Sequence, residues 1–539
     1  MSRFDCTNIC TFTGIESVSK MCKAVKSIGD IEIVERSKQK PEYAATVEDA
    51  LSSTGFGKYN FGLLLVCSWT LQAMGMDLFG ISFVVAAAVC DLELTMQQRA
   101  LLTATPLCGV VLGAQLWGYV ADTRGRRLTL TLSMSIGFVF AALSSLSPDW
   151  KTMAVLKLIS STFTSASNSV TYTLLGESCS AHTRGRAMLL CTCALMCSQG
   201  VVAVLAYPIL PLQFAYPIPF LGIIYRSWRL LALVMALPCA LTAGILQMYY
   251  ESPKFLASRG RYEEALGVLR NIYKWNTGHG AESFPVKKLI EEKDNQSISN
   301  GSFFRSLWLQ TAPLFRAPLL KDTLKLFYIV TIIYMTGSGF IMWLPYIMNN
   351  LFTVLEAGGG DGMNLCTVIR YSNQDNLIIN GTAIDDVCDA TIQDTTLFSA
   401  ITYGALASFS NLVLSLTCGA HKRLAMMFIL SVSAASAVLL NLVAVPIAGG
   451  IFFFFFLLGA LSMGILSVYF VELYPTSVRG MASCLSIMIG RLSAFFGVNA
   501  IGALIAANCE ATFYVWSLLL LSAIVIAWFL PRDHGYSTP

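Results

Sequence analysis

This chain contains few charged residues. Only 13% of its 539 residues are Asp, Glu, Lys or Arg, whereas 55% are hydrophobic and the mean hydropathy is strongly positive. Charged residues make up about 25% of a typical soluble globular protein. Composition alone therefore excludes an ordinary soluble domain and indicates a protein embedded in a lipid bilayer.

Histidines and phosphate-binding loops are also scarce. The chain has 4 His, no zinc-type Cys/His spacing and no Gly-x-x-x-x-Gly-Lys sequence. We therefore expect no metal site, no cofactor, no nucleic-acid partner and no enzymatic activity. ATP-driven transport is disfavoured on the same grounds, which leaves coupling to an ion gradient or facilitated diffusion.

Long apolar stretches dominate what is present. A helix needs roughly 20 apolar residues to cross a bilayer, and about twelve such stretches occur in two groups of six. They lie near 59–87, 100–121, 128–147, 152–176, 187–210 and 228–250, and near 323–348, 396–417, 423–445, 449–471, 482–506 and 511–530. The sequence predicts an all-α polytopic membrane protein with twelve transmembrane helices in two six-helix pseudo-symmetric bundles.

This pattern divides the chain into five parts. We expect a cytosolic N-terminal arm, an N-terminal bundle, a cytosolic central linker with short helices, a C-terminal bundle and a cytosolic tail, at 1–58, 59–250, 251–321, 322–530 and 531–539. Lys and Arg gather in the loops after the second, fourth and eighth spans and in the linker, whereas 349–395 is acidic. Because positive loops stay cytoplasmic, both termini are expected inside and the acidic loop outside.

The acidic outer loop carries two further candidates. Asn380 begins the sequon Asn-Gly-Thr on the side where glycosylation occurs, so a glycan is expected there. Cys366 and Cys388 lie in the same oxidising compartment, where a disulfide between them is possible. Two free thiols, or pairing with Cys90 or Cys509 at other outer ends, are the alternatives.

One short charged pattern occurs twice, at the end of the fourth span of each half. Glu177 precedes Arg184 by the same offset that separates Glu472 from Arg479, and a Gly follows each Arg. An internal duplication is the simplest account. Such charges at equivalent places are what a transporter with two rocking bundles needs to close one mouth.

The loop after the second span contains a related group of charges. It reads Gly118-Tyr-Val-Ala-Asp122-Thr-Arg124-Gly-Arg126-Arg. An Asp beside permanently charged arginines can form charge-assisted bonds that lock one arrangement of helices. Positive-inside anchoring alone would explain the arginines but neither Asp122 nor the spaced glycines.

These segments resemble the signature motifs of the major facilitator superfamily. Glu251-Ser-Pro-Lys-Phe-Leu is similar to the end of the sixth span, and the segment from Val471 to Gly480 to the end of the tenth, in its sugar-porter and organic-ion branches. With Val47-Glu-Asp-Ala, Cys90-Asp-Leu and Ser227-Trp-Arg, the chain resembles the synaptic vesicle glycoprotein 2 and related-protein group, particularly its invertebrate members.

The second half departs from the family pattern. Its counterpart of the first loop motif, Cys418-Gly-Ala-His-Lys-Arg, lacks the Asp, so the two halves should contribute unequally to a gate. The outer loop is also much shorter than the large luminal domain of the best-known members. A luminal receptor-like role is therefore not carried across.

Ionisable residues inside spans are candidate functional sites because burying them is costly. Asp77 lies in the first span, where relatives place a carboxylate, and is either a proton or cation site or a permanently paired structural group. Arg491 lies roughly 13 Å inside the eleventh span at 1.5 Å per residue. It is either an anion-binding or counter-ion group or an interhelical bridge. Lys157 is expected to snorkel as an anchor.

The resemblance also suggests which residues line a cavity. In the superfamily, the first, fourth, seventh and tenth spans surround the substrate. On that basis Asn168, Trp343 and Tyr469 are candidate lining residues.

Two functional hypotheses follow. The first is a secondary active or facilitative transporter of a small polar or charged solute, possibly with a co-transported proton, gated by Asp122, Arg126, Glu177, Arg184, Glu251, Glu472 and Arg479. The second is a vesicle-membrane protein that keeps the transporter scaffold but acts through protein partners, which the sequence does not identify. The membrane is the plasma membrane or that of an intracellular vesicle.

Overall fold

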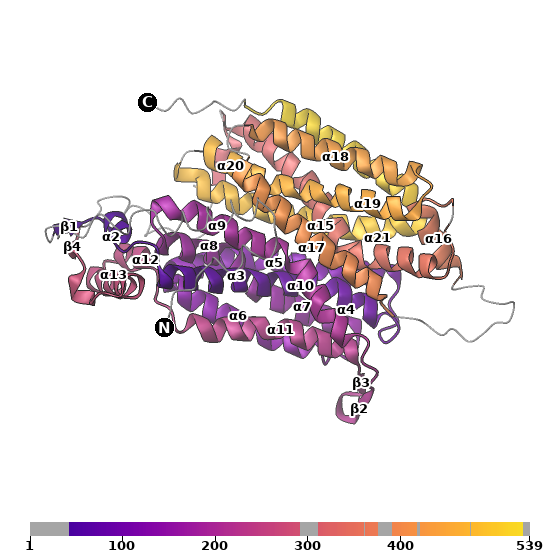
Figure 1. The fold of residues 1–539 in the computed structure, drawn as a ribbon, viewed down its shortest axis with the longest axis horizontal. Helices are drawn as coiled ribbons and strands as arrows, with labels where there is room; N and C mark the ends of the chain where they lie inside the picture. The colour runs from indigo at the N-terminus through magenta and orange to yellow at the C-terminus, as the bar shows by residue number, and fades with distance from the viewer. Residues whose placement is uncertain are drawn as a thin grey trace, which may run out of the picture.

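The computed structural model describes residues 43–290, 311–317, 319–360, 362–375, 391–417, 421–474 and 476–531, with some side chains inside these ranges left undescribed. Figure 1 shows two groups of helices packed side by side, one from each half of the chain. The expected all-α, two-bundle architecture is confirmed. Short strands occur only at the two ends of the described molecule.

The N-terminal bundle contains helices that continue across breaks. Its members are α3 (Lys58–Phe79), α4 (Ile81–Ala88), α5 (Met96–Arg124), α6 (Arg126–Ser144), α7 (Trp150–Thr164), α8 (Ala166–Ser178), α9 (Ala181–Met196), α10 (Ser198–Ile209) and α11 (Ser227–Leu246). The pairs α3/α4, α7/α8 and α9/α10 each form one crossing. Such broken helices are common where transporter helices surround a binding site.

The C-terminal bundle follows the same plan. It comprises α15 (Leu320–Glu356), α17 (Asp394–Thr417), α18 (Lys422–Leu442), α19 (Pro446–Leu457), the short turn η5 (Leu458–Leu461), α20 (Ser462–Leu473) and α21 (Thr476–Trp528). Helix α21 is two crossings in one, because Asn508 has non-helical φ and ψ of −157° and 96°. A separate outer helix, α16 (Leu365–Asp375), follows α15.

Nine helices in the described part are long and apolar enough to span a membrane, or ten if the bent pair α9/α10 counts as one span. The expected twelve are reached because α21 contains two crossings and because α7 and α8 together make the fourth. That fourth crossing is divided at Ser165 into helices of 15 and 13 residues, each shorter than the roughly 20 residues that a span needs.

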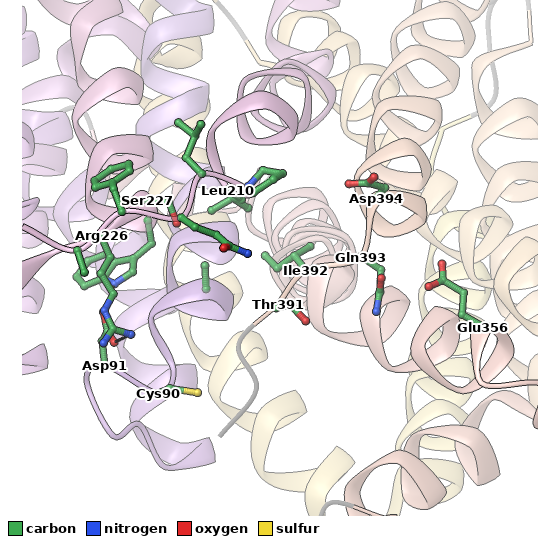
Figure 2. A pocket seen from close by; sticks show the side chains of 17 residues that line it. Cys90, Asp91, Leu210, Arg226, Ser227, Glu356, Thr391, Ile392, Gln393 and Asp394 are labelled. Atoms are coloured by element: carbon green, nitrogen blue, oxygen red, sulfur yellow. Dashed lines mark hydrogen bonds and ion pairs between the residues drawn. The ribbon is translucent and has the colours of Figure 1, made fainter. Parts of the chain in front are cut away.

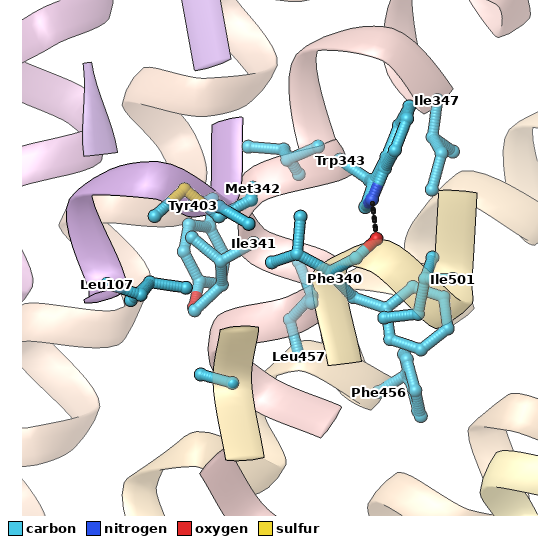
Figure 3. Packing of buried hydrophobic residues seen from close by; sticks show 14 of the residues in the cluster. Leu107, Phe340, Ile341, Met342, Trp343, Ile347, Tyr403, Phe456, Leu457 and Ile501 are labelled. Atoms are coloured by element: carbon cyan, nitrogen blue, oxygen red, sulfur yellow. Dashed lines mark hydrogen bonds between the residues drawn. The ribbon is translucent and has the colours of Figure 1, made fainter. Parts of the chain in front are cut away.

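The bundles are held by close backbone contacts and aromatic packing. Helices α10 and α17 approach so closely that a Cβ on Gly404 would lie 2.7 Å from the Gly200 nitrogen. Within the C-terminal bundle, Phe340 of α15 meets Phe456 edge-on with ring centroids 4.8 Å apart (Figure 3). It also stacks on Phe513, with centroids 5.2 Å apart. Small residues at helix crossings are what membrane bundles use in place of a hydrophobic driving force.

A compact cap covers one end of the N-terminal bundle. Strand β1 (Tyr43–Ala45) pairs in parallel with β4 (Val286–Leu289), and α2 (Val47–Ser53) packs with α12 (Pro253–Ser258) and α13 (Tyr262–Thr277) around a shared apolar core. We expected a separate arm and linker. Instead the last part of the arm is an integral piece of the linker's fold (Figure 1).

The end opposite the cap carries a hairpin and a disulfide. Strands β2 (Tyr216–Ile218) and β3 (Ile223–Tyr225) pair antiparallel through a 3₁₀ turn, η2 (Pro219–Leu221). Cys366 of α16 is bonded to Cys509, with Cα atoms 5.5 Å apart. The suggested Cys366–Cys388 bond is therefore wrong, and one of its alternatives is correct, because α16 folds back onto the kink of α21. Cys388 and Asn380 lie outside the described residues.

Candidate functional site

A buried ion pair lies inside the N-terminal bundle. Asp77 of α3 and Lys157 of α7 are 2.8 Å apart, and each side chain is 2% exposed. Thr164 donates to the carboxylate at 3.1 Å, and Ser160 lies within hydrogen-bond distance of both oxygens. Burial and pairing of Asp77 agree with either sequence interpretation. The expected snorkelling of Lys157 is wrong, because its ammonium group turns inward to this carboxylate.

Arg491 is the counterpart charge in the C-terminal bundle, but its surroundings differ. It lies on α21 and is 6% exposed, and its guanidinium carbon is 5.6 Å from the ring centre of Tyr334 on α15. Its Nε has no hydrogen-bond partner among the described residues. The alternative interpretation of Arg491 was an interhelical bridge. Among the described residues, its contact on α15 is an aromatic ring and not a carboxylate.

The three candidate lining residues are placed differently. Asn168 of α8 is half-buried, while Tyr469 of α20 and Trp343 of α15 are buried. The Trp343 indole donates to the Val498 carbonyl at 3.0 Å and so joins α15 to α21 (Figure 3). Its role as a lining residue stays a prediction.

The loop-motif charges form a network at the end of the N-terminal bundle that carries the cap. The Arg126 guanidinium contacts Glu177 through two nitrogens at 3.0 and 3.1 Å and Asp122 at 3.2 Å. Asp122 is 75% exposed, so the bond from Arg126 to Glu177 is the better shielded one. Glu177 also accepts from Ser252 at 2.5 Å, which ties the end of α8 to the cap.

Glu251 caps the start of α6. Its carboxylate accepts from the backbone N–H of Arg126 at 2.8 Å and of Arg127 at 3.0 Å. A carboxylate at a helix N-terminus satisfies unpaired amides and complements the helix dipole. The carboxylate can come this close because the α6 N-cap is Gly125, which has no side chain and adopts φ 109°. A Cβ at this position would lie 2.4 Å from the Glu251 carboxylate.

Glu177 and Arg184, which share the duplicated pattern, have different partners. Arg184, in the first turn of α9, donates back to the Gly176 carbonyl at 2.7 Å and forms an ion pair with Glu48 of the arm at 2.8 Å. Lys254 also pairs with Glu48. The tight reversal between α8 and α9 aims Arg184 at the carbonyl end of α8 rather than at Glu177.

Glu472 and Arg479 belong to α20 and α21, but their side chains lie outside the described residues. Within the described part of the chain, the hydrogen bonds and ion pairs of the gate residues lead to the N-terminal bundle, the arm or the linker. Asp122 is in addition near enough to Cys484 of α21 for the two side chains to interact electrostatically. Closure of the mouth between the bundles by the two Glu–Arg patterns therefore stays a prediction.

A cavity of about 930 Å³ opens between the two halves at the end opposite the cap. Figure 2 shows Asp91 and Arg226 on one side and Glu356 and Asp394 on the other. Asp91 binds Arg226 at 2.8 Å and accepts from the Trp228 indole at 2.7 Å. The sequence pieces Cys90-Asp-Leu and Ser227-Trp-Arg thus meet in space, which sequence reasoning missed because nothing in a pattern reveals a contact 137 residues apart.

The family assignment follows from comparison. A family model described as Major Facilitator Superfamily matches residues 65–361, more than half of the chain. The chain belongs to the major facilitator superfamily. It is a multi-pass membrane protein, as the sequence predicted.

Curated relatives within this superfamily confirm the narrower resemblance. Synaptic vesicle glycoprotein 2A of Bos taurus is 30% identical over 267 residues, which cover 48% of this chain and 36% of that relative. Synaptic vesicle glycoprotein 2C of Mus musculus is 27% identical over 343 residues, 59% of this chain and 46% of that relative. The match thus spans less than half of either relative.

Solved structures of this superfamily share the fold. The partially occluded inward open xylose transporter XylE from E. coli has a TM-score of 0.61 at 16% identity, covering 88% of this chain and 100% of that one. The proton:xylose symporter XylE bound to 6-bromo-6-deoxy-D-glucose has a TM-score of 0.59 at 17% identity, covering 88% and 97%. At this identity the likeness is one of fold.

Proposed function

We propose that this protein is a secondary active or facilitative transporter that moves a small polar or charged organic solute by alternating access. The observation that carries this proposal is the Asp77–Lys157 ion pair, fully buried in a transmembrane bundle. Ionisable groups at such depth are costly and mark ion or substrate pathways. The superfamily fold and the transport named in the XylE titles support the same function.

The proposal includes proton coupling at Asp77. Protonation of its carboxylate would remove the charge that holds Lys157, so the protonated and ionised forms would favour different packing of α3 against α7. Ser160 and Thr164 can hydrogen-bond to either form. The proposal also puts both termini in the cytosol, and the basic residues Lys254 and Arg259 in the cap support this orientation.

The test is uptake of a solute library into proteoliposomes with and without a pH gradient. Asp77→Asn and Lys157→Met are each expected to abolish gradient-driven accumulation and to destabilise the protein by about 3–5 kcal/mol, because each leaves a buried partner uncompensated. The double variant should regain thermal stability but not gradient dependence. Gradient-driven accumulation by the double variant would show that the pair is structural.

A second candidate function is a vesicle-membrane protein that acts through partners. The likeness to synaptic vesicle glycoproteins and the folded cytosolic cap favour it. Wild-type proteoliposomes that take up no solute above empty liposomes, together with a cellular phenotype lost on deletion of residues 1–57 but kept in Asp77→Asn, would support this candidate over transport.

A further inference from the structure

Arg491 stands out among the buried cations of the spans. Lys157 has Asp77, and Arg229 donates to the carbonyls of Ser145 and Ser147 at 3.0 and 2.7 Å. Arg491, at 6% exposure, has no hydrogen bond or ion pair with any residue in the described part of the chain. It is thus a buried charge whose compensation must come from elsewhere.

The described group that contacts this charge is the aromatic ring of Tyr334. Gly490, next to Arg491 on α21, leaves room for that ring, since a Cβ on Gly490 would lie 2.6 Å from it. The guanidinium carbon stands 5.6 Å from the ring centre. A cation–π contact orients the guanidinium and partly offsets its desolvation, but it leaves the five N–H donors without acceptors.

The position of Arg491 is close to the N-terminal bundle. One helical turn earlier on α21, Met488 accepts a hydrogen bond from Gln115 of α5 at 3.1 Å. Tyr334 is also near enough to Tyr172 of α8 for the two phenols to interact electrostatically. Arg491 therefore lies near the boundary of the two bundles and within the membrane, where transporters of this architecture bind substrate.

We propose that Arg491 binds the anionic group of the transported solute, so that the substrate is a small organic anion with a carboxylate, sulfate or phosphate. This inference rests on the proposed transport function. The planar guanidinium presents two parallel N–H donors that match a carboxylate or phosphate edge. The solute would supply the negative charge that the described protein lacks here, and Tyr334 would hold the guanidinium plane in place.

The experiment uses solutes that share a skeleton and differ in charge. Gluconate, glucose and glucosamine form one set, and benzoate, benzyl alcohol and benzylamine form another. Uptake into proteoliposomes is measured for wild type, Arg491→Leu, Arg491→Lys and the control Arg316→Leu, which removes an exposed arginine just before α15. The wild type should take up the anion of at least one set in preference to its neutral and cationic analogues.

Arg491→Leu should lower that anion uptake by about tenfold to a hundredfold, the loss expected for a hydrogen bond to a charged group. Arg491→Lys should keep part of it, and Arg316→Leu all of it. Thermal midpoints provide the second readout. An uncompensated buried charge predicts that Arg491→Leu melts at or above the wild-type temperature, whereas a structural bridge predicts a lower one.

Two failures are distinguishable. If the wild type transports a neutral or cationic solute best and Arg491→Leu leaves that rate unchanged, the anion inference is overturned and transport stands. If the wild type transports nothing from this panel or from the wider library, the transport proposal fails with it. A lowered thermal midpoint with unchanged anion selectivity would likewise overturn the role of Arg491.

Discussion

Glu48 is the residue on which the docking of the arm depends. Burial raises the pKa of its carboxyl, but Lys254 and Arg184 outweigh that effect and hold the pKa below the ordinary value. The undocked arm then binds a proton more readily than the docked arm. Docking is therefore favoured above the ordinary Glu pKa of about 4.3 and weakens as pH falls through the lowered value.

Glu48→Gln should loosen the arm without unfolding the bundles. The two ion pairs are partly exposed, so their loss is expected to cost only about 0.5–1 kcal/mol, equivalent to a roughly two- to fivefold gain in local opening. Hydrogen exchange of the amides in 46–53 measures it. Glu263→Gln, an exposed carboxylate on α13, is the control. Equal protection in both variants at neutral pH would contradict the role of Glu48.

Sequence could find the buried charges but not all their partners. Asp77 and Arg491 were visible because a charge among apolar residues is conspicuous. The Lys157 partner was missed because a lysine near a helix end can reach water equally well. The pairing of Arg184 with Glu48 was missed because the arm lacks the apolar periodicity that indicates a packed element. The last residues of the arm nevertheless fold with the linker.

Among the elements, α10 and α17 form a close backbone contact between the bundles, called here the α10/α17 seam. These helices must move relative to one another if the bundles tilt, and their backbones meet at Gly200 and Gly404. Next to this seam, α17 also contacts α9, since the Ser408 hydroxyl donates to the Cys193 carbonyl at 3.0 Å. A glycine contact allows close approach without interlocking side chains, which suits surfaces that separate and re-form.

Gly404→Leu should therefore impair transport more than folding. Forcing a large side chain into this contact disfavours the packed arrangement by about 1–3 kcal/mol. Initial uptake rates should fall, while the thermal midpoint changes less. Gly244→Leu on α11 is the matched control, because a Cβ there meets nothing within 4 Å. If the two variants transport equally well, the seam does not need close approach.

The sequence likewise predicted most of the helices but not the breaks within them. The length of the apolar stretches predicted the crossings, and the short helices expected in the linker include α12 and α13. The break at Ser165 between α7 and α8 and the kink at Asn508 within α21 have no counterpart in the apolar pattern of the sequence. The disulfide partner of Cys366 depended on how α16 folds back, which no spacing rule supplies.

At the scale of the molecule, the two halves are alike in architecture but unequal in chemistry. The N-terminal half contains a compensated ion pair and carries the cap, whereas the C-terminal half contains an uncompensated arginine among its described residues. The outer cavity is lined by both halves (Figure 2), so its shape must change if they tilt. Proton binding in one half and solute binding near the other would then meet at their boundary.

The most direct test measures distances across both mouths by pulsed electron spin resonance in nanodiscs. Spin labels replace Leu212 and Ala357 at the outer end and His182 and His421 at the cytosolic end, with the free cysteines changed to serine. Between pH 8 and pH 5, and between wild type and Asp77→Asn at pH 8, alternating access predicts that one distance lengthens as the other shortens. Two distance distributions that stay fixed under every condition would contradict it.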